Sequence, residues 1–175
     1  RQMCIRDSSY TTFDVETVSA GVVNSNCTSE ANKLYAKVRV TNTGKFSGKE
    51  VVQVYIAKPQ GKLGKPAKEL AAFEKTRELQ PGESQLMILT WEINDMASYD
   101  DLGKVKKSAY VLEAGSYDIY VGTSVRDVTK ADYSYILNHD VITEQLSAKL
   151  VPTSLPKRML ADGSYEALPQ REPVD

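Results

Sequence analysis

The chain has 175 residues, a length that suits one domain or one domain with tails. Its 22 Lys and Arg residues nearly balance its 23 Asp and Glu residues, and the formal net charge at pH 7 is −1. This balance argues against a nucleic-acid partner, and the short apolar runs exclude a membrane-spanning segment.

The N-terminal residues 1–9 fit no periodic pattern and do not begin with Met. We expect this segment to be non-native or disordered, and the chain to be a fragment whose true N-terminus is missing. No signal peptide is visible, and the interpretation of Cys4 and Cys27 as two free thiols favours the cytoplasm over an oxidising compartment.

Three strands are predicted in the first third of the chain, over Tyr10–Val23 and over about 33–42 and 48–58. In the second strand an apolar row alternates with polar residues, and in the third strand Val52, Val54 and Ile56 alternate in the same way. A period of two places one row of each strand in a core. Between them, Asn42, Thr43 and Gly44 are residues that form turns. The row of the second strand is Leu34, Ala36, Val38 and Val40.

The middle of the chain alternates between turns and strands. Residues 59–68 are rich in Gly, Pro and Lys and predict a mobile connection. Glu69–Leu79 could begin a helix, but the turn at Pro81 and Gly82 favours a strand. A strand over Glu83–Ile93 would place four apolar side chains on one face, namely Met87, Leu89, Trp91 and Ile93.

Asn94–Asp101 predicts a turn with room for one helical turn, and its acidic cluster is expected to cap or solvate that turn. Further strands are predicted over Ala109–Glu113, Gly115–Thr123 and Tyr133–Asn138. In total, about seven strands with frequent turns and no separating helix indicate an all-β fold. The expected architecture is an immunoglobulin or fibronectin type III-like antiparallel sandwich. The cluster consists of Asp95, Asp100 and Asp101.

The pattern changes after Asn138. Residues 139–150 are predicted to form a short helix, and the proline-rich residues 151–175 a linker or docking tail. The expected organisation is therefore an N-terminal segment over 1–9, a sandwich domain over 10–138 and a tail over 139–175.

No group of residues in the sequence predicts catalysis, a metal site or a cofactor. His139 is the single histidine and has no partner for a nucleophilic relay. The two cysteines lack the spacing of zinc ligands. We therefore predict no catalytic residue in this chain.

Two tyrosines are candidates for binding. Tyr55 and Tyr120 are predicted to point away from the core on neighbouring strands. Three interpretations remain open: a stacking platform for a sugar, a surface buried against another domain of the same polypeptide, and isolated tyrosines on a sheet surface.

An ordered set of short motifs resembles the fibronectin type III-like domain of family 3 glycoside hydrolases, the β-glucosidase and β-xylosidase family. Each motif is weak alone, but their order is specific, and they extend over about residues 10–138. The motifs are Val40-Thr41-Asn42-Thr43-Gly44, Gly48-Lys49-Glu50-Val51-Val52-Gln53-Val54-Tyr55, Pro66, Lys68-Glu69-Leu70, Phe73, Leu79, Pro81-Gly82-Glu83-Ser84, Tyr99-Asp100, Gly115-Ser116-Tyr117, Val121-Gly122-Thr123-Ser124 and Asp127.

The resemblance implies a non-catalytic accessory domain. In that family the nucleophile is an aspartate on a (β/α)8 barrel and the acid/base is usually a glutamate on an α/β sandwich domain, and this chain contains neither domain. The resemblance implies that these two domains of the same polypeptide are its partners. The alternatives are a carbohydrate-binding module and a generic fibronectin-type interaction domain. The residues expected at the docking surface are Pro66, Lys68, Glu69, Leu70, Phe73, Tyr55 and Tyr120.

Overall fold

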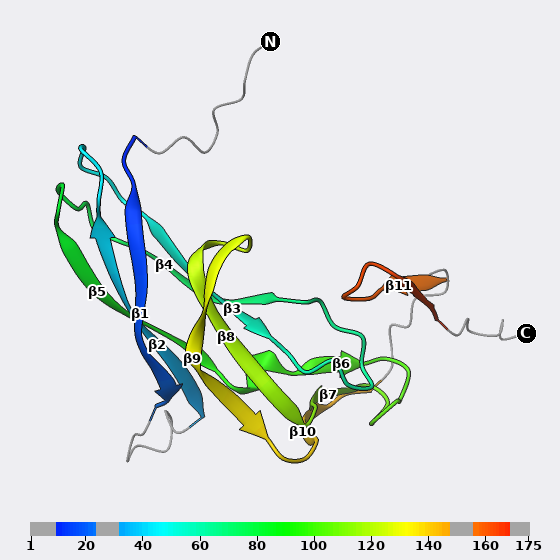
Figure 1. Cartoon of the computed structure of the whole chain (residues 1–175). Coiled ribbons are helices and arrows are strands. Elements are labelled where there is room, and N and C mark those ends of the chain that lie inside the picture. The colour runs from blue at the N-terminus through cyan, green and yellow to red at the C-terminus, as the bar shows by residue number, and fades with distance from the viewer. Residues whose placement is uncertain (1–9, 24–31, 148–155, 169–175) are drawn as a thin grey trace, which may run out of the picture.

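A computed structural model describes residues 10–23, 32–147 and 156–168 of the chain. Within these residues two antiparallel sheets face each other (Figure 1), with the strand orders β1-β2-β5 and β4-β3-β8-β9. The prediction of an all-β sandwich is confirmed. The strands of the two sheets are β1 (Phe13–Val22), β2 (Lys33–Asn42), β3 (Val51–Ala57), β4 (Glu69–Lys75), β5 (Ser84–Glu92), β8 (Gly115–Ser124) and β9 (Asp127–Leu137).

Smaller elements complete the described part of the chain. A 3-10 turn η1 (Asn94–Met96) follows β5. A small sheet has the order β10-β7-β6, and a two-stranded hairpin pairs β11 with β12. Their bounds are β6 (Ser98–Asp100), β7 (Ala109–Leu112), β10 (Val141–Gln145), β11 (Lys157–Met159) and β12 (Tyr165–Ala167).

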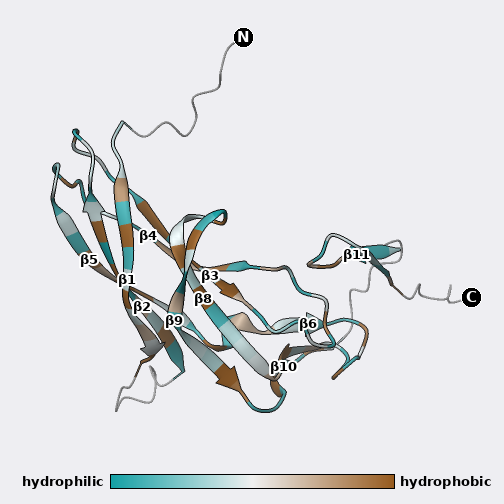
Figure 2. Ribbon diagram, viewed as in Figure 1, coloured by the Kyte–Doolittle hydropathy of each residue, from teal (hydrophilic) through white to brown (hydrophobic). Residues whose placement is uncertain are grey.

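The core lies between the two large sheets, and every second side chain of their central strands enters it. Figure 2 shows the alternation as bands of brown and teal along these strands. The apolar rows that the sequence predicts are buried, including Trp91 on β5 and Tyr117 on β8. Complete burial of one such side chain contributes about 1.5–3 kcal/mol. The other members of these rows include Leu34, Ala36, Val38, Val40, Val52, Val54, Ile56, Met87, Leu89, Ile119 and Val121.

Two sequence-based expectations need correction. The helix predicted over residues 139–150 is wrong, because Val141–Gln145 form strand β10, which pairs with β7. The exposed edge of β7 offers backbone partners that a local pattern does not reveal. The connection over 59–68 is also not loosely attached. The Glu113 carboxylate accepts backbone hydrogen bonds from Lys62 and Leu63, and it forms a buried ion pair with Lys65.

Part of the predicted tail forms the β11–β12 hairpin, which ion pairs connect to the loop after β6. The Arg158 guanidinium on β11 donates to the Glu166 carboxylate on β12 at 2.8 Å and forms an ion pair with Asp101 at 3.3 Å. Lys104 also forms an ion pair with Glu166. These charges hold the hairpin beside the loop that follows β6.

Asn42, from the motif at the end of β2, is a fully buried polar hub. Its amide Nδ2 donates to the backbone oxygens of Phe46 and Leu79, at 2.8 and 2.9 Å. Its Oδ1 accepts from the Thr11 hydroxyl at 2.7 Å and from the Gly44 backbone N–H at 3.0 Å. Gly44 lies so close to Thr11 that an added Cβ would be 2.0 Å from its hydroxyl oxygen. The motif thus joins three segments of the chain.

Replacement of Asn42 by Ala is expected to lower the free energy of unfolding by about 3 kcal/mol, because it removes four hydrogen bonds of a fully buried side chain. Chemical denaturation of the isolated chain measures this loss. The matched control is Thr43→Ala at the next, exposed position, for which we expect a change below about 0.5 kcal/mol. Equal losses in the two variants would contradict the role given to Asn42.

Candidate docking surface

The structure brings the predicted docking residues together on the outer face of the four-stranded sheet. Leu70 on β4 is paired with Tyr55 on β3, and Tyr55 is paired with Tyr120 on β8. This order confirms that the two tyrosines lie on neighbouring strands. Phe73 is paired with Gln53 further along the same strands. Residues directly opposite each other in paired strands have Cβ atoms about 4.5–5.5 Å apart, so their side chains form a continuous row.

Exposure differs along this row. Phe73 and Leu70 are the most open, with 69% and 50% of their surface accessible. Tyr55 and Tyr120 are only half-exposed. The Lys68 ammonium lies over the Tyr120 ring, 4.7 Å from its centroid. This cation–π contact covers part of one face of the ring, which weakens the case for a sugar platform at this position.

The remaining predicted residues lie at the margin of the row. Pro66 is exposed in the connection before β4. Glu69 forms an ion pair with the buried Lys58 ammonium, which compensates the cost of burying that charge. Glu69 therefore has a structural partner within the domain, whereas Leu70 and Phe73 leave half or more of their surface open.

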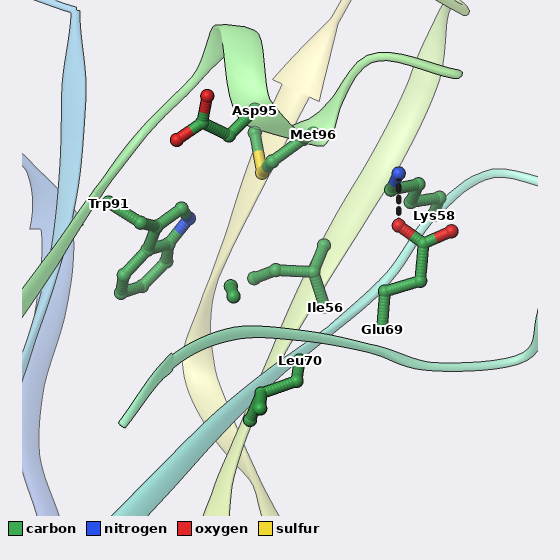
Figure 3. Close-up of a pocket in the computed structure, with 8 residues that line it drawn as sticks. Ile56, Lys58, Glu69, Leu70, Trp91, Asp95 and Met96 are labelled. Atoms are coloured by element: carbon green, nitrogen blue, oxygen red, sulfur yellow. Dashed lines mark ion pairs between the residues drawn. The ribbon is translucent and has the colours of Figure 1, made fainter. Parts of the chain in front are cut away.

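A small pocket of about 60 Å³ opens beside this margin (Figure 3). Its lining includes Trp91, Met96, Ile56 and Asp95, and the Lys58–Glu69 ion pair lies at one side. The Trp91 indole is almost fully buried, and its Nε1 has no hydrogen-bond partner among the described residues. A buried donor without a hydrogen-bond partner costs free energy, so this N–H group lowers the stability of the fold.

The acidic cluster has a structural role at Asp100, which is completely buried. One carboxylate oxygen accepts from the backbone N–H groups of Gly103 and Lys104 and the other from those of Val105 and Lys106, at 2.6–3.0 Å. Burial raises the pKa of Asp100, but the four backbone donors together outweigh it and hold the pKa below its ordinary value. The expectation that this cluster caps a turn is therefore confirmed for Asp100.

The other candidate groups show no reactive arrangement. His139 is exposed after β9. Within residues 10–23, 32–147 and 156–168, no group of His, Cys, Asp and Glu could hold a metal ion. No helix of the described residues is long and apolar enough to cross a membrane. Cys4 and Cys27 lie outside the described residues.

Sequence reasoning missed two features near this surface. The buried Lys65–Glu113 ion pair joins residues 48 positions apart, one in a loop and one at the end of a predicted strand. The unpaired Trp91 N–H depends on the packing around it rather than on its strand. A lysine between Gly64 and Pro66 is an ordinary loop composition, so the sequence carried no signal for the ion pair.

Comparison with known proteins agrees with this architecture. The family "Fibronectin type III-like domain" matches residues 50–125. The chain is 57% identical to β-glucosidase A from Butyrivibrio fibrisolvens, over 95% of this chain and 21% of that protein. It is 40% identical to a β-glucosidase from Ruminococcus albus, over 92% of this chain and 16% of that protein.

Solved structures give the same result. A β-glucosidase from Paenibacillus barengoltzii superposes with a TM-score of 0.78 at 42% identity, over 94% of this chain and 19% of that one. A GH3 β-glucosidase from Bifidobacterium adolescentis has a TM-score of 0.61 at 27% identity, over 81% of this chain and 19% of that one.

The chain thus contains a fibronectin type III-like domain. It belongs to the group of such domains found in family 3 glycoside hydrolases, and it spans only about a fifth of the relatives' length. The two sequence alignments cover so much of the chain that they include most of residues 139–175. The tail is therefore shared with these bacterial relatives.

Replacement of Asp100 by Asn is expected to reduce the free energy of unfolding by about 2–3 kcal/mol at pH 7, because four charge-assisted bonds become weaker. A carboxyl group whose pKa is lower in the folded state than in the unfolded state stabilises the fold at pH values above its unfolded-state pKa. This stabilisation is lost as the pH falls through the folded-state pKa. The difference in the free energy of unfolding between the unsubstituted chain and the Asp100→Asn variant should therefore be largest above about pH 5. It should shrink as the pH falls below 3.8.

Urea denaturation of both proteins across this pH range measures the effect. Asp132→Asn is the matched control, since Asp132 is exposed and should change stability by less than about 0.5 kcal/mol. A difference for Asp100→Asn that stays constant down to pH 2 would contradict the assignment.

Replacement of Trp91 by Phe keeps an aromatic ring in the core and removes the unpaired N–H. We expect a loss below about 1.5 kcal/mol, because relief of the unsatisfied donor offsets part of the lost packing. Leu89→Ala in the same row should cost about 2–5 kcal/mol. Thermal and chemical denaturation of both variants give the comparison, and a loss above 3 kcal/mol for Trp91→Phe would indicate a bonded N–H.

Proposed function

We propose that this chain is a non-catalytic accessory domain of a β-glucosidase-type glycoside hydrolase. In this proposal it packs against the catalytic domains of the same polypeptide and stabilises them. The observation that carries the proposal is the exposed row on β4, β3 and β8, in a chain that spans about a fifth of its relatives. We propose the (β/α)8 barrel and the α/β sandwich domain of the family as the partners.

The chemistry of the row fits a permanent contact within one polypeptide. Phe73 and Leu70 present apolar surface, and the half-exposed tyrosines add rings with a polar end. Large exposed apolar side chains that form one patch are typical of interaction surfaces. Lys68 lies beside the row and would form part of its polar rim, and Pro66 is exposed next to it.

The proposal assigns no catalytic role to the described residues of this chain. Hydrolysis of a glycosidic bond needs two carboxyl groups held at a set separation across a cleft. Asp100 is buried and bonded to four backbone N–H groups, so it is not available for such chemistry. We propose that the carboxyl pair of the enzyme lies in the other domains.

The docking role is tested by the double substitution Leu70→Ala and Phe73→Ala. In the multidomain protein we expect the free energy of unfolding to fall by about 2–4 kcal/mol, because both side chains lose buried apolar surface. In the isolated chain the same change should stay below about 0.5 kcal/mol, since both residues are at least half exposed. Denaturation of the two forms in parallel gives the contrast.

Phe46→Ala is the matched control. Phe46 has 63% of its surface exposed in the loop between β2 and β3, away from the row. The Phe46→Ala substitution should change the free energy of unfolding by the same small amount in the multidomain protein and in the isolated chain. An equal effect of the double substitution in the two forms would contradict docking through this row.

The location of the chemistry is tested with aryl β-glucosides and aryl β-xylosides. We expect turnover by the multidomain protein and none by the isolated chain, even at high protein concentration. Turnover that remains with the isolated chain through purification would overturn the proposal. The exposed carboxylates Asp95 and Asp101 would then be the first residues to replace.

A further inference from the structure

A second aromatic pair lies on the small sheet, away from the docking row. Tyr99 on β6 is paired with Tyr110 on β7, and Tyr110 is paired with Glu144 on β10. The ring centroids of the two tyrosines are 5.4 Å apart, with an angle of 57° between the ring planes. Their neighbours Asp100 and Ala109 are fully buried, so the tyrosines and Glu144 occupy the outward face.

Tyr110 also lines an open cleft of about 400 Å³ between η1 and β10. Asn94 and Asp95 come from η1, and Thr143 and Glu144 come from β10. This size lies near the lower end of the range that small-molecule sites occupy. The cleft therefore combines one aromatic side chain with polar groups from two different elements.

Three of the polar side chains that line this cleft are not used by the fold, whereas the Thr143 hydroxyl donates to the Tyr110 backbone oxygen at 3.3 Å. Within the described part of the chain, the side chains of Asn94, Asp95 and Glu144 make no hydrogen bond or ion pair. Each of them has acceptor oxygens, and the Asn94 amide also donates. The cleft has two carboxylates and no cationic side chain in its lining, so it disfavours anionic ligands.

We propose that this cleft is a binding site for a neutral pyranoside. An aromatic ring packs against the apolar C–H face of a sugar ring, and carboxylate and amide oxygens accept hydrogen bonds from its hydroxyl groups. Tyr110 supplies the first contact, and Asp95, Glu144 and Asn94 supply the second. The choice of a β-linked glucoside as the ligand rests on the function proposed above.

The site is distinct from a platform at Tyr55 and Tyr120. Tyr110 and Glu144 lie on another sheet, and Asp95 also lines the small pocket beside Leu70. The site would retain a substrate or product on the enzyme without taking part in bond cleavage.

The test is a nuclear magnetic resonance titration of the 175-residue chain with cellobiose, up to about 50 mM, which detects dissociation constants in the millimolar range. We expect shifts at η1, β7 and β10, and a dissociation constant at least tenfold higher for Tyr110→Ala. Glu144→Gln and Asp95→Asn should weaken binding several-fold. Their well-dispersed spectra would show that these exposed substitutions leave the fold intact.

Two controls test whether the binding is specific for this site and for a sugar ring. Tyr165→Ala changes an exposed tyrosine on the β11–β12 hairpin and should leave binding unchanged. Mannitol has hydroxyl groups but no ring face, and it should give no saturable shift.

Three outcomes would overturn the proposal: no shift with cellobiose, an equal response to mannitol, or shifts centred on Tyr55 and Tyr120. Because the titration uses the isolated chain, its failure leaves the docking experiment unaffected, and failure of docking would leave this titration unaffected.

Discussion

The packing of two sheets against each other decides which residues of this domain remain available for other contacts. A strand buries every second side chain and turns the others outward. In β3 the inward row is Val52, Val54 and Ile56, and the outward row includes Gln53 and Tyr55. The core thus uses one row of each central strand, and contact with another domain is left to the outward rows, the edge strands and the loops.

Buried polar groups hold the loops at both ends of this sandwich. Asn42 joins the segment before β1 to the loops after β2 and before β5. Asp100 gathers the backbone N–H groups of the loop after β6, and Glu113 fastens the connection after β3. Each group would be costly if left without partners, and each has them in the fold. The loops are therefore defined by specific contacts, although their sequences are polar and rich in glycine.

These constraints agree with an accessory role. The strongest electrostatic interactions, at Asp100 and Lys65–Glu113, are buried and structural. What the described surface offers is aromatic and apolar side chains on two separate sheets, one row on β4, β3 and β8 and a pair on β6 and β7. The first suits a neighbouring domain. The second lies beside free carboxylates and suits a small polar ligand.

Much of the fold could be predicted from the sequence, because alternation along a strand is a local property. The rows of β2, β3, β5 and β8 follow directly from the period of two, and so does the outward direction of Tyr55 and Tyr120. The turn at Pro81 and Gly82 was enough to favour a strand over a helix in the segment that forms β4.

The tertiary structure alone decided the rest. Strand β10 exists because β7 offers an edge, the Lys65–Glu113 ion pair joins distant loops, and the unpaired Trp91 N–H depends on its packing. The cleft at Tyr110 likewise gathers residues from η1, β7 and β10. No local pattern encodes such contacts, because each depends on where two distant segments meet after the sheets have closed. The sequence by itself determined which side chains point inward, and the tertiary structure determined which of the others lie together.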